Sequence, residues 1–398
     1  MHKDPGPRRG PGLVHTAGME QHLYEPVHEE FRALCRQFLA REVVPFHEEW
    51  ERAGLVDREV WRKAGAAGLL GLDVDEKYGG AGQRDFRFNA VLVEEIIAAG
   101  ASGLGFGLHN DVVAPYLTDL TTDLQKARWL PGFCSGELIT AIAMSEPGAG
   151  SDLAGVRTTA VRDGDEYVLN GQKTFITNGE HADLVIVVVK TAPDQGAHGV
   201  SLIAVERDTP GFIRGRRLDK VGLRANDTAE LFFDDCRVPV ENLIGTENHG
   251  FYHLMANLPR ERLSIAVAAV AAAERMLAMT LEYARTREAF GRPIGRFQHN
   301  RFLLAELDTE VTIARTFLNH CIAEFNAGRL SVADAAKVKW WTTELQNKVA
   351  DRCVQIHGGY GYMREYPIAK AWLDSRVQTI YGGTTEIMKE IIGRSLGL

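Results

Sequence analysis

The 398-residue sequence is poor in cysteine and has no pair of cysteines at metal-binding spacing. Its five cysteines stand singly, at Cys35, Cys134, Cys236, Cys321 and Cys353. The lack of any Cys-x-x-Cys leaves zinc and thioredoxin-type sites unsupported, and neither His-Glu-x-x-His nor a calcium-type carboxylate spacing occurs. We therefore expect no metal site and buried, reduced thiols of a cytosolic kind.

A large excess of one charge and a long apolar run are also missing. The formal net charge is −8 with both signs interspersed, which is unlike the basic footprint of a nucleic-acid-binding protein. No apolar run approaches the roughly 18 residues that span a bilayer, so no membrane span is expected. With 45% apolar and 25% charged residues, the composition is typical of a soluble globular enzyme.

The first residues differ in composition from the rest of the chain. The segment up to Gly18 is rich in proline and glycine and lacks an apolar core. It predicts a disordered extension over residues 1–19 rather than a signal peptide, with Met19 as a candidate natural start. The alanine-, glycine- and arginine-rich composition favours a bacterial cytoplasmic protein over one of the mitochondrial matrix.

Hydrophobic periodicity divides the remainder into three regions. Apolar residues recur at helical spacing in residues 20–137 and again in residues 249–398, whereas residues 138–248 carry short β-branched runs between turn residues. The predicted fold is α+β multidomain: a helical N-terminal domain, a middle antiparallel β domain and a C-terminal four-helix-bundle domain. The predicted helices are 26–44, 60–70, 89–99, 263–281, 303–325, 332–354 and one starting at 387; Asn170-Gly171 predicts a hairpin.

Two glycine-rich stretches each admit two interpretations. The loop Met144–Asp152 follows an apolar run, and its small residues permit the backbone to approach a large polar cofactor or simply to turn between strands. The tract Gly103–Gly107 is either a loop before a helix or the wall of a narrow cavity.

Two short motifs match known enzyme patterns but lack their context. Gly148 to Leu153 begins like a dinucleotide-binding fingerprint, but the third glycine and the following helix are missing. Gly393 to Gly397 has the form of a nucleophile elbow, but it lies at the C-terminus with no helix after it. We assign function to neither.

Six longer stretches, spread over nearly everything after residue 20, resemble the acyl-CoA dehydrogenase family. They are Met144 to Asp152, Thr174 to Asn178, Leu258 to Leu263, Arg285 to Gly291 with Gln298, Gln355 to Gly361 with its continuation through Asp374, and Ile380 to Glu386. The resemblance implies the three-domain fold of that family, FAD as cofactor and an acyl-CoA substrate.

One position narrows the resemblance to the long-chain and isovaleryl-type members. Most of the family places a catalytic glutamate after the tyrosine of the last motif, where this sequence has Gly382. The long-chain and isovaleryl types place it on a C-terminal-domain helix before an arginine, and here Glu261-Arg262 stands there. The resemblance thus implies that Glu261 is the base and that the Gly382 N–H and a ribityl hydroxyl of FAD donate hydrogen bonds to the thioester oxygen. The alternative for Glu261 is a carboxylate at a helix N-terminus, and the alternative for Gly382 and Gly383 is a plain glycine turn.

The resemblance also carries over the cofactor contacts. From the β domain these are Ile142, Met144, Ser145, Gly150, Ser151, Phe175, Ile176 and Thr177, and from the end of the chain Thr384, Thr385 and Glu386. A neighbouring subunit would supply Arg287, Gln298, Gln355, Gly358 and Gly359. Phe175 stands where many members carry tryptophan, and Arg287 is either the pyrophosphate counter-charge or a surface arginine.

The substrate contacts that the resemblance implies lie on three segments. They are Ser151, Ala197, His198, Tyr252, Pro259, Arg260, Glu261, Arg262, Gly382 and Gly383. His198 lies in a loop of variable composition and fits a surface position equally well.

The implied reaction is the FAD-dependent α,β-dehydrogenation of a medium-to-long or branched acyl-CoA to the trans-2-enoyl-CoA. Electrons would pass to an electron-transferring flavoprotein, and the chain would form a homo-oligomer, a tetramer in this family. The alternatives are an acyl-CoA oxidase, a dehydrogenase for branched or steroid side-chain thioesters, and a non-catalytic flavoprotein scaffold.

Overall fold

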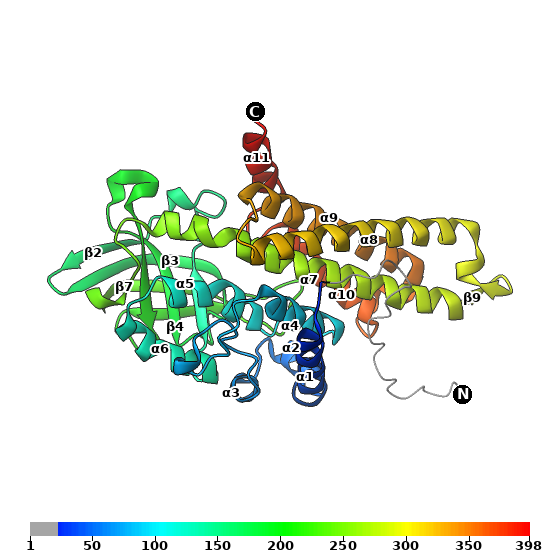
Figure 1. Cartoon of the computed structure of the whole chain (residues 1–398), viewed down its shortest axis with the longest axis horizontal. Coiled ribbons are helices and arrows are strands. Elements are labelled where there is room, and N and C mark those ends of the chain that lie inside the picture. The colour runs from blue at the N-terminus through cyan, green and yellow to red at the C-terminus, as the bar shows by residue number, and fades with distance from the viewer. Residues whose placement is uncertain (1–22) are drawn as a thin grey trace.

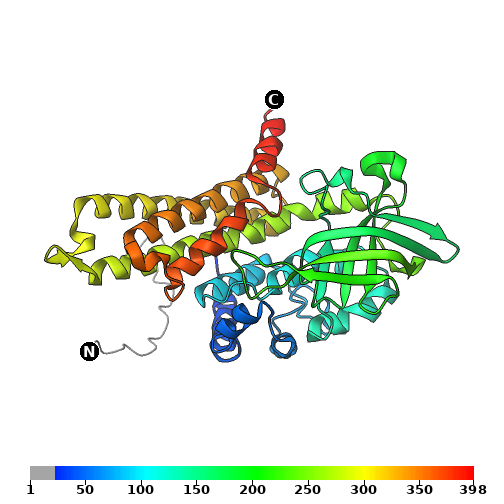
Figure 2. The same ribbon diagram turned by 180° about the vertical axis from the view of Figure 1, so that it is seen from behind.

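The computed structural model describes residues 23–398, in which helices at both ends of the chain flank a β domain (Figures 1 and 2). The predicted extension 1–19 and the candidate start Met19 lie outside the described residues. The helical, β, helical order and the three-domain architecture predicted from the sequence are confirmed.

The N-terminal region is helical, and polar residues mark where its helices begin. Asp57 and Asp85 each accept a backbone N–H two residues on, at 2.9 Å, and Thr122 forms a capping box with Gln125. The helices are α1 (Pro26–Glu42), α2 (His47–Ala53), α3 (Arg58–Ala66), α4 (Phe86–Ala98), α5 (Ala114–Asp119) and α6 (Asp123–Ser135), with a π-helical turn at Leu108–Val113. The sequence predicted α1, α3 and α4 with shifted ends and missed the others.

The middle region forms one sheet. Its strands are β1 (Thr140–Ala143), β2 (Thr159–Asp163), β3 (Glu166–Thr177), β4 (Leu184–Lys190), β5 (Val200–Glu206), β6 (Phe212–Arg217), β7 (Thr228–Pro239) and β8 (Leu243–Ile244). They lie in the order β6-β7-β3-β2-β4-β5-β8, with β1 also paired to β4. Most pairings are antiparallel as predicted, but β1 and β2 each pair with β4 in parallel.

The hairpin predicted at Asn170-Gly171 is wrong. Both residues lie inside β3, and the turn lies earlier, between Asp163 and Glu166. β3 continues because β7 pairs with both of its halves, across a register shift at Leu169/Gly171. A Cβ on Gly171 would come within 2.7 Å of the Thr158 Cα. Glycine is therefore required here by the close approach of another backbone segment and not by a turn.

The C-terminal region is built on three long helices. These are α7 (Gly250–Thr286), α8 (Gln298–Asn326) and α9 (Val332–His357); the shorter α10 (Pro367–Ser375) and α11 (Thr385–Ser395) follow, and β9 (Glu288–Ala289) and β10 (Arg292–Pro293) form a small hairpin at one end (Figure 1). α7 begins 13 residues before the predicted apolar run and continues through Pro259. It therefore extends from the β domain to the far end of the bundle.

α7 also qualifies the expectation that no stretch could span a membrane. By length and composition alone it passes that test, with a mean hydropathy of 1.5 over 18 residues. However, 61% of that window is buried against the rest of the protein, and its residues belong to the bundle core. We interpret it as a core helix.

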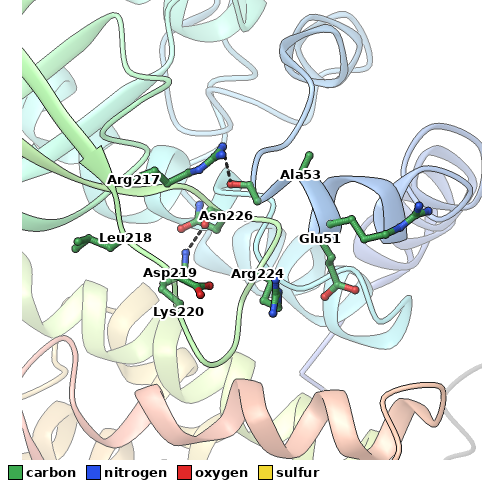
Figure 3. Close-up of a pocket in the computed structure, with 10 residues that line it drawn as sticks. Glu51, Ala53, Arg217, Leu218, Asp219, Lys220, Arg224 and Asn226 are labelled. Carbon is green, nitrogen blue, oxygen red and sulfur yellow. Dashed lines mark hydrogen bonds between the residues drawn. The ribbon is translucent and has the colours of Figure 1, made fainter.

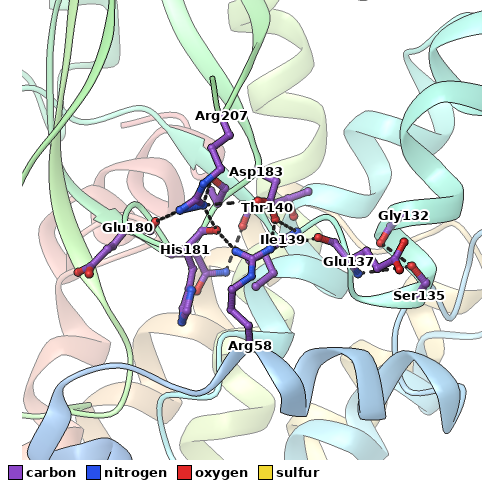
Figure 4. Close-up of polar contacts among 12 residues, drawn as sticks. Arg58, Gly132, Ser135, Glu137, Ile139, Thr140, Glu180, His181, Asp183 and Arg207 are labelled. Carbon is purple, nitrogen blue, oxygen red and sulfur yellow. Dashed lines mark hydrogen bonds and ion pairs between the residues drawn. The ribbon is translucent and has the colours of Figure 1, made fainter. Parts of the chain in front are cut away.

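Arginines join the helical regions to the sheet and to each other. Arg58 of α3 pairs with Asp183 at 2.5 Å and donates to the His181 carbonyl, which also accepts from Arg207 (Figure 4). On the other side, fully buried Glu94 of α4 pairs with Arg32 at 2.9 Å and with Arg315 of α8 at 2.6 Å. These contacts join the sheet to α3 and the bundle to α4 of the N-terminal region.

Candidate active site

Glu261 lies inside the protein, on the long helix α7. It is the twelfth residue of that helix and only 7% exposed. This position excludes the interpretation of Glu261 as a carboxylate at a helix N-terminus, because the dipole acts within the first turn. The carboxyl group is instead buried among side chains, where its ionised form is disfavoured.

The surroundings of Glu261 raise its pKa to about 7. Burial is the main cause, while a hydrogen bond from the Tyr116 hydroxyl to Oε1, at 3.1 Å, and the charge of Arg262 act in the opposite direction. A pKa near neutrality suits a group that must accept a proton and later release it. Tyr116, on α5, was not among the predicted site residues.

The Gly382-Gly383 turn faces the same part of α7. Both glycines have left-handed backbones, with φ of 65° and 98°, and a Cβ on Gly382 would overlap the Cδ1 methyl group of Ile265. Arg262 donates to the Gly382 carbonyl at 3.3 Å and Lys339 to the Gly383 carbonyl at 2.7 Å. The two carbonyls are thus held, whereas the Gly382 N–H has no acceptor among the described residues.

Lys339 was missed by sequence reasoning because it lies on α9 outside every motif. Its side chain is completely buried, and burial together with the nearby Arg262 lowers its pKa to about 8. Lys339 stabilises the Gly382-Gly383 turn by donating a hydrogen bond to the Gly383 carbonyl.

The loop after β1 and the end of β3 form the β-domain part of the predicted site. The Thr174 N–H donates to the Ser145 carbonyl at 2.9 Å, which holds the two segments together. Phe175 is 69% exposed and adopts a φ of 61°, a strained conformation for an aromatic residue. A Cβ on Gly148 or Gly150 would meet no atom within 4 Å. The loop thus leaves open space above it, which favours the cofactor interpretation over a plain turn.

A buried ion pair supports this loop from below. Lys173 Nζ lies 2.8 Å from Glu146 Oε1 and also donates to the Met144 carbonyl at 3.2 Å. Glu146 in turn accepts the backbone N–H groups of Arg157 and Thr158. Neither Lys173 nor Glu146 was predicted as a site residue, although Glu146 lies within the glycine-rich motif.

The structure brings three of the predicted substrate contacts together. His198 and Ala197 lie in the short turn Pro193–Gly199, and the His198 ring is 3.1 Å from the Tyr252 hydroxyl at the start of α7. Arg260 is differently placed: its guanidinium pairs with Asp73 at 2.8 Å. Its side chain therefore joins α7 to the N-terminal region, and we do not retain it as a side-chain contact to substrate.

A second group of predicted cofactor contacts lies at the far end of the bundle. The Arg287 guanidinium lies 5.7 Å from the centre of the Tyr360 ring, and Tyr283 stacks on His357 at 4.2 Å. This end also carries Gln298, the first residue of α8, and Gln355, Gly358 and Gly359 at the end of α9. Arg287 follows Glu261 by 26 residues, which corresponds to roughly 39 Å along a helix. One chain therefore does not bring both groups together.

The remaining predicted contacts lie at the start of α11. Thr384 caps this helix by accepting the Ile387 N–H at 3.3 Å, and the Thr385 hydroxyl donates to Glu344 at 2.6 Å. Glu386 is exposed. Both hydroxyls are engaged within the fold, because the Thr384 side chain also hydrogen-bonds Glu386.

The tract Gly103–Gly107 is a loop before the π-helical turn. A Cβ on Gly105 would come within 2.6 Å of Asn178 Oδ1, and one on Gly103 within 3.0 Å of the Asn226 nitrogen. Protein atoms fill the space beside these glycines, which favours the loop interpretation. A separate hollow of about 370 Å³ lies between α2 and residues 217–226 (Figure 3), and no predicted site residue lines it.

Comparison with known proteins identifies the family. Models of the N-terminal, middle and C-terminal domains of acyl-CoA dehydrogenase match residues 25–137, 141–236 and 248–397. The mitochondrial long-chain specific acyl-CoA dehydrogenase of Rattus norvegicus is 50% identical over 376 residues, 94% of this chain and 87% of that protein. The mitochondrial isovaleryl-CoA dehydrogenase of Solanum tuberosum is 36% identical over 377 residues, 94% of this chain and 91% of that protein.

Comparison with solved structures leads to the same family. The acyl-CoA dehydrogenase of Geobacillus kaustophilus superposes with a TM-score of 0.94 at 51% identity, over 95% of this chain and 100% of that one. A glutaryl-CoA dehydrogenase of Mycobacterium smegmatis, solved with FADH₂, has a TM-score of 0.86 at 27% identity, over 94% and 95% of the two chains. The resemblance to the long-chain and isovaleryl types is confirmed, and the chain is an oxidoreductase that belongs to the acyl-CoA dehydrogenase family of flavoproteins.

Proposed function

We propose that the protein oxidises a medium-to-long or branched-chain acyl-CoA to its trans-2-enoyl-CoA with FAD as cofactor. The observation that carries this proposal is a buried glutamate with a pKa of about 7 on the helix that packs against the Gly382-Gly383 turn, whose Gly382 N–H has no acceptor among the described residues. The identity to the long-chain specific enzyme of Rattus norvegicus supports the chain length.

Glu261 would remove a proton from the α-carbon of the thioester. Its ionised form is available at neutral pH, and because its pKa is near 7 it can also give the proton up to solvent after turnover. The thioester oxygen becomes more negative as this proton leaves. The free N–H of Gly382 would donate to that oxygen, a kind of contact commonly worth ~3–4 kcal/mol.

The residues present fit FAD. The open space above Gly148 and Gly150 and the exposed ring of Phe175 suit a planar ring system. The Arg287 guanidinium, which pairs with no carboxylate of residues 23–398, suits a pyrophosphate. The side chains that would hold the FAD ring from the β domain are Ser145, Ser151 and Thr177. Thr384 would contact FAD from the side of the helical bundle. When bound, FAD supplies the acceptor for the hydride that leaves the β-carbon.

A second copy of the chain would complete this site. The roughly 39 Å between Glu261 and Arg287 requires that Arg287, Gln298 and residues 355–359 reach the flavin of a neighbour. We therefore propose an obligate homo-oligomer, a tetramer by resemblance, that passes electrons to an electron-transferring flavoprotein. The cytoplasm of a bacterium remains the expected location.

The test of the proposal is the Glu261→Gln variant. It should retain FAD and bind acyl-CoA, yet fail to bleach the flavin when acyl-CoA is added anaerobically. Glu282→Gln, an exposed glutamate on the same helix, is the matched control and should bleach as the parent does. Bleaching by Glu261→Gln at the parental rate would contradict the base assignment.

Three further measurements define the activity. A turnover series over acyl-CoA lengths, with 2-methyl variants included, would identify the substrate. The rate at which the reduced enzyme reacts with O₂ separates a dehydrogenase, which reacts slowly, from an oxidase. Absence of DNA binding at low salt would exclude the alternative of a non-catalytic scaffold that binds nucleic acid.

A further inference from the structure

Tyr116 is a buried tyrosine whose hydroxyl reaches the site from a different part of the chain. It is completely buried on α5, 145 residues before Glu261. The preceding turn, Leu108–Val113, is a π-helix, a form found mostly at functional sites. Pro115 follows that turn and has no N–H to continue regular helical bonding, which accounts locally for the irregular backbone that carries the tyrosine.

The Tyr116 hydroxyl lies between two polar side chains of α7. It donates to Glu261 Oε1 at 3.1 Å, and the side chain of Asn257, one helical turn earlier, hydrogen-bonds the same hydroxyl. Within residues 23–398, the recorded side-chain hydrogen bond to this carboxylate goes to Oε1, and Oε2 accepts none. The two oxygens of the base are therefore not equivalent.

We propose that Tyr116 is a positioning residue for the base: its hydroxyl holds Oε1 of Glu261, so that Oε2 takes the proton. The inference rests on the proposed function of Glu261. The Cα–H bond of the substrate would break, its proton would form an O–H bond with Oε2, and its electron pair would form the second Cα–Cβ bond as the hydride of the β-carbon passes to FAD. The Tyr116 hydroxyl keeps its own proton throughout.

The same hydrogen bond sets the protonation state of the base. A donor to a carboxylate favours the ionised form, so the Tyr116 hydroxyl lowers the pKa that burial raises. The other charged group that acts on Glu261 is Arg262 on the same helix, which also lowers its pKa. Lys339 of α9 does not act on Glu261 directly: it donates to the Gly383 carbonyl, and Arg262 lowers the pKa of Lys339 itself. Loss of the hydroxyl should therefore raise the pKa of Glu261 above 7.

Tyr116→Phe tests this inference, because it removes the hydroxyl and keeps the ring. The measurement is the rate of flavin reduction by acyl-CoA in the FAD-loaded protein, from pH 6 to pH 9. If the pKa of the base rises by about one pH unit, the ionised fraction at pH 7 falls from about one half to about one tenth. Reduction should then be roughly fivefold slower at pH 7 and nearly parental at pH 9, with substrate affinity unchanged.

Two further proteins make the result specific. Tyr167→Phe removes the hydroxyl of a buried tyrosine in the β domain and should leave the pH profile unchanged. Replacement of Tyr116 by 3-fluorotyrosine keeps the ring and strengthens the donor, so its pH profile should move toward lower pH. This second substitution decides the question if Tyr116→Phe folds poorly.

The outcomes separate the inference from the proposed function. An unchanged pH profile in both Tyr116 variants overturns the positioning role, while Glu261 remains the base if Glu261→Gln does not bleach. A uniform loss of rate at every pH also overturns it, since that would indicate a structural role. Failure of the parent protein to be reduced by any acyl-CoA overturns the proposed function itself.

Discussion

Glu261, the proposed base, is buried and forms no ion pair with the described residues, so it should cost the protein stability that Glu261→Gln recovers. The pKa of Glu261 is raised from its ordinary value of 4.5 to about 7, with the group wholly buried. Between these two pH values the unfolded chain has lost the proton that the folded chain still holds. The free energy of unfolding must therefore fall as pH rises through this interval.

The size of the effect follows from the two pKa values. At about 1.36 kcal/mol per pH unit, the full cost is about 3 kcal/mol, reached above pH 7. At pH 5.5 only about 1.4 kcal/mol is lost, and below pH 4 almost none. A glutamine has no charge to lose and still accepts from Tyr116, so the variant should be more stable by these amounts.

Thermal unfolding at several pH values measures the difference. An unfolding entropy of about 2.1 cal/mol/K per residue gives on the order of 0.8 kcal/mol/K for 398 residues that unfold as one unit. The variant should then melt about 4 °C above the parent at pH 8 and about 2 °C above it at pH 5.5.

Glu94→Gln is the matched control, because Glu94 is equally buried but paired with two arginines. Burial alone would raise its pKa, yet Arg315 and Arg32 lower it. Its ionised form thus stabilises the fold above the ordinary pKa, and the benefit is lost only as pH falls below it. Glu94→Gln should destabilise by about 3–5 kcal/mol, equally at pH 5.5 and pH 8. A gain for Glu261→Gln that does not grow with pH would refute the reasoning.

Three further predictions concern the site. The rate of flavin reduction in the parent protein should rise with pH through an apparent pKa near 7, as Glu261 ionises, and a rate independent of pH from 6 to 9 would contradict this. Gly382→Ala should lower the free energy of unfolding, measured in urea, more than Gly328→Ala does. Both glycines have φ near 65–69°, which costs an alanine about 1–2 kcal/mol, but only at position 382 would the added Cβ overlap Ile265. Lys173→Met should cost about 3–5 kcal/mol and lower FAD retention, because it leaves Glu146 buried without its partner; equal FAD content in variant and parent would refute the support role of the pair.

The sequence was informative where function depends on residue identity at fixed spacing. The exchange of glutamate and glycine between positions 261 and 382 led to Glu261 as the proposed base, and the structure places these residues on facing segments. The order of the domains followed from periodicity, since helical and strand periods differ over long stretches.

What the sequence could not provide depends on long-range contacts. Asn170-Gly171 has the composition of a hairpin turn, but β7 pairs on both sides of it and keeps the strand continuous. Arg260 belongs to a family motif, yet its side chain forms an ion pair with Asp73 of the N-terminal region. Tyr116 and Lys339 lie outside all motifs and reach the site only through packing between helices.

The length and apolarity of α7 have a consequence for synthesis on the ribosome. The helix is complete at residue 286, but α8 and α9, which cover it, end only at residues 326 and 357. At ~5–20 residues per second the ribosome needs roughly 4–14 s to make the intervening chain. During that interval a helix apolar enough to enter a bilayer lacks at least one of the two long helices that cover it in the bundle. The helix that carries Glu261 is therefore the segment of the nascent chain on which chaperones should act.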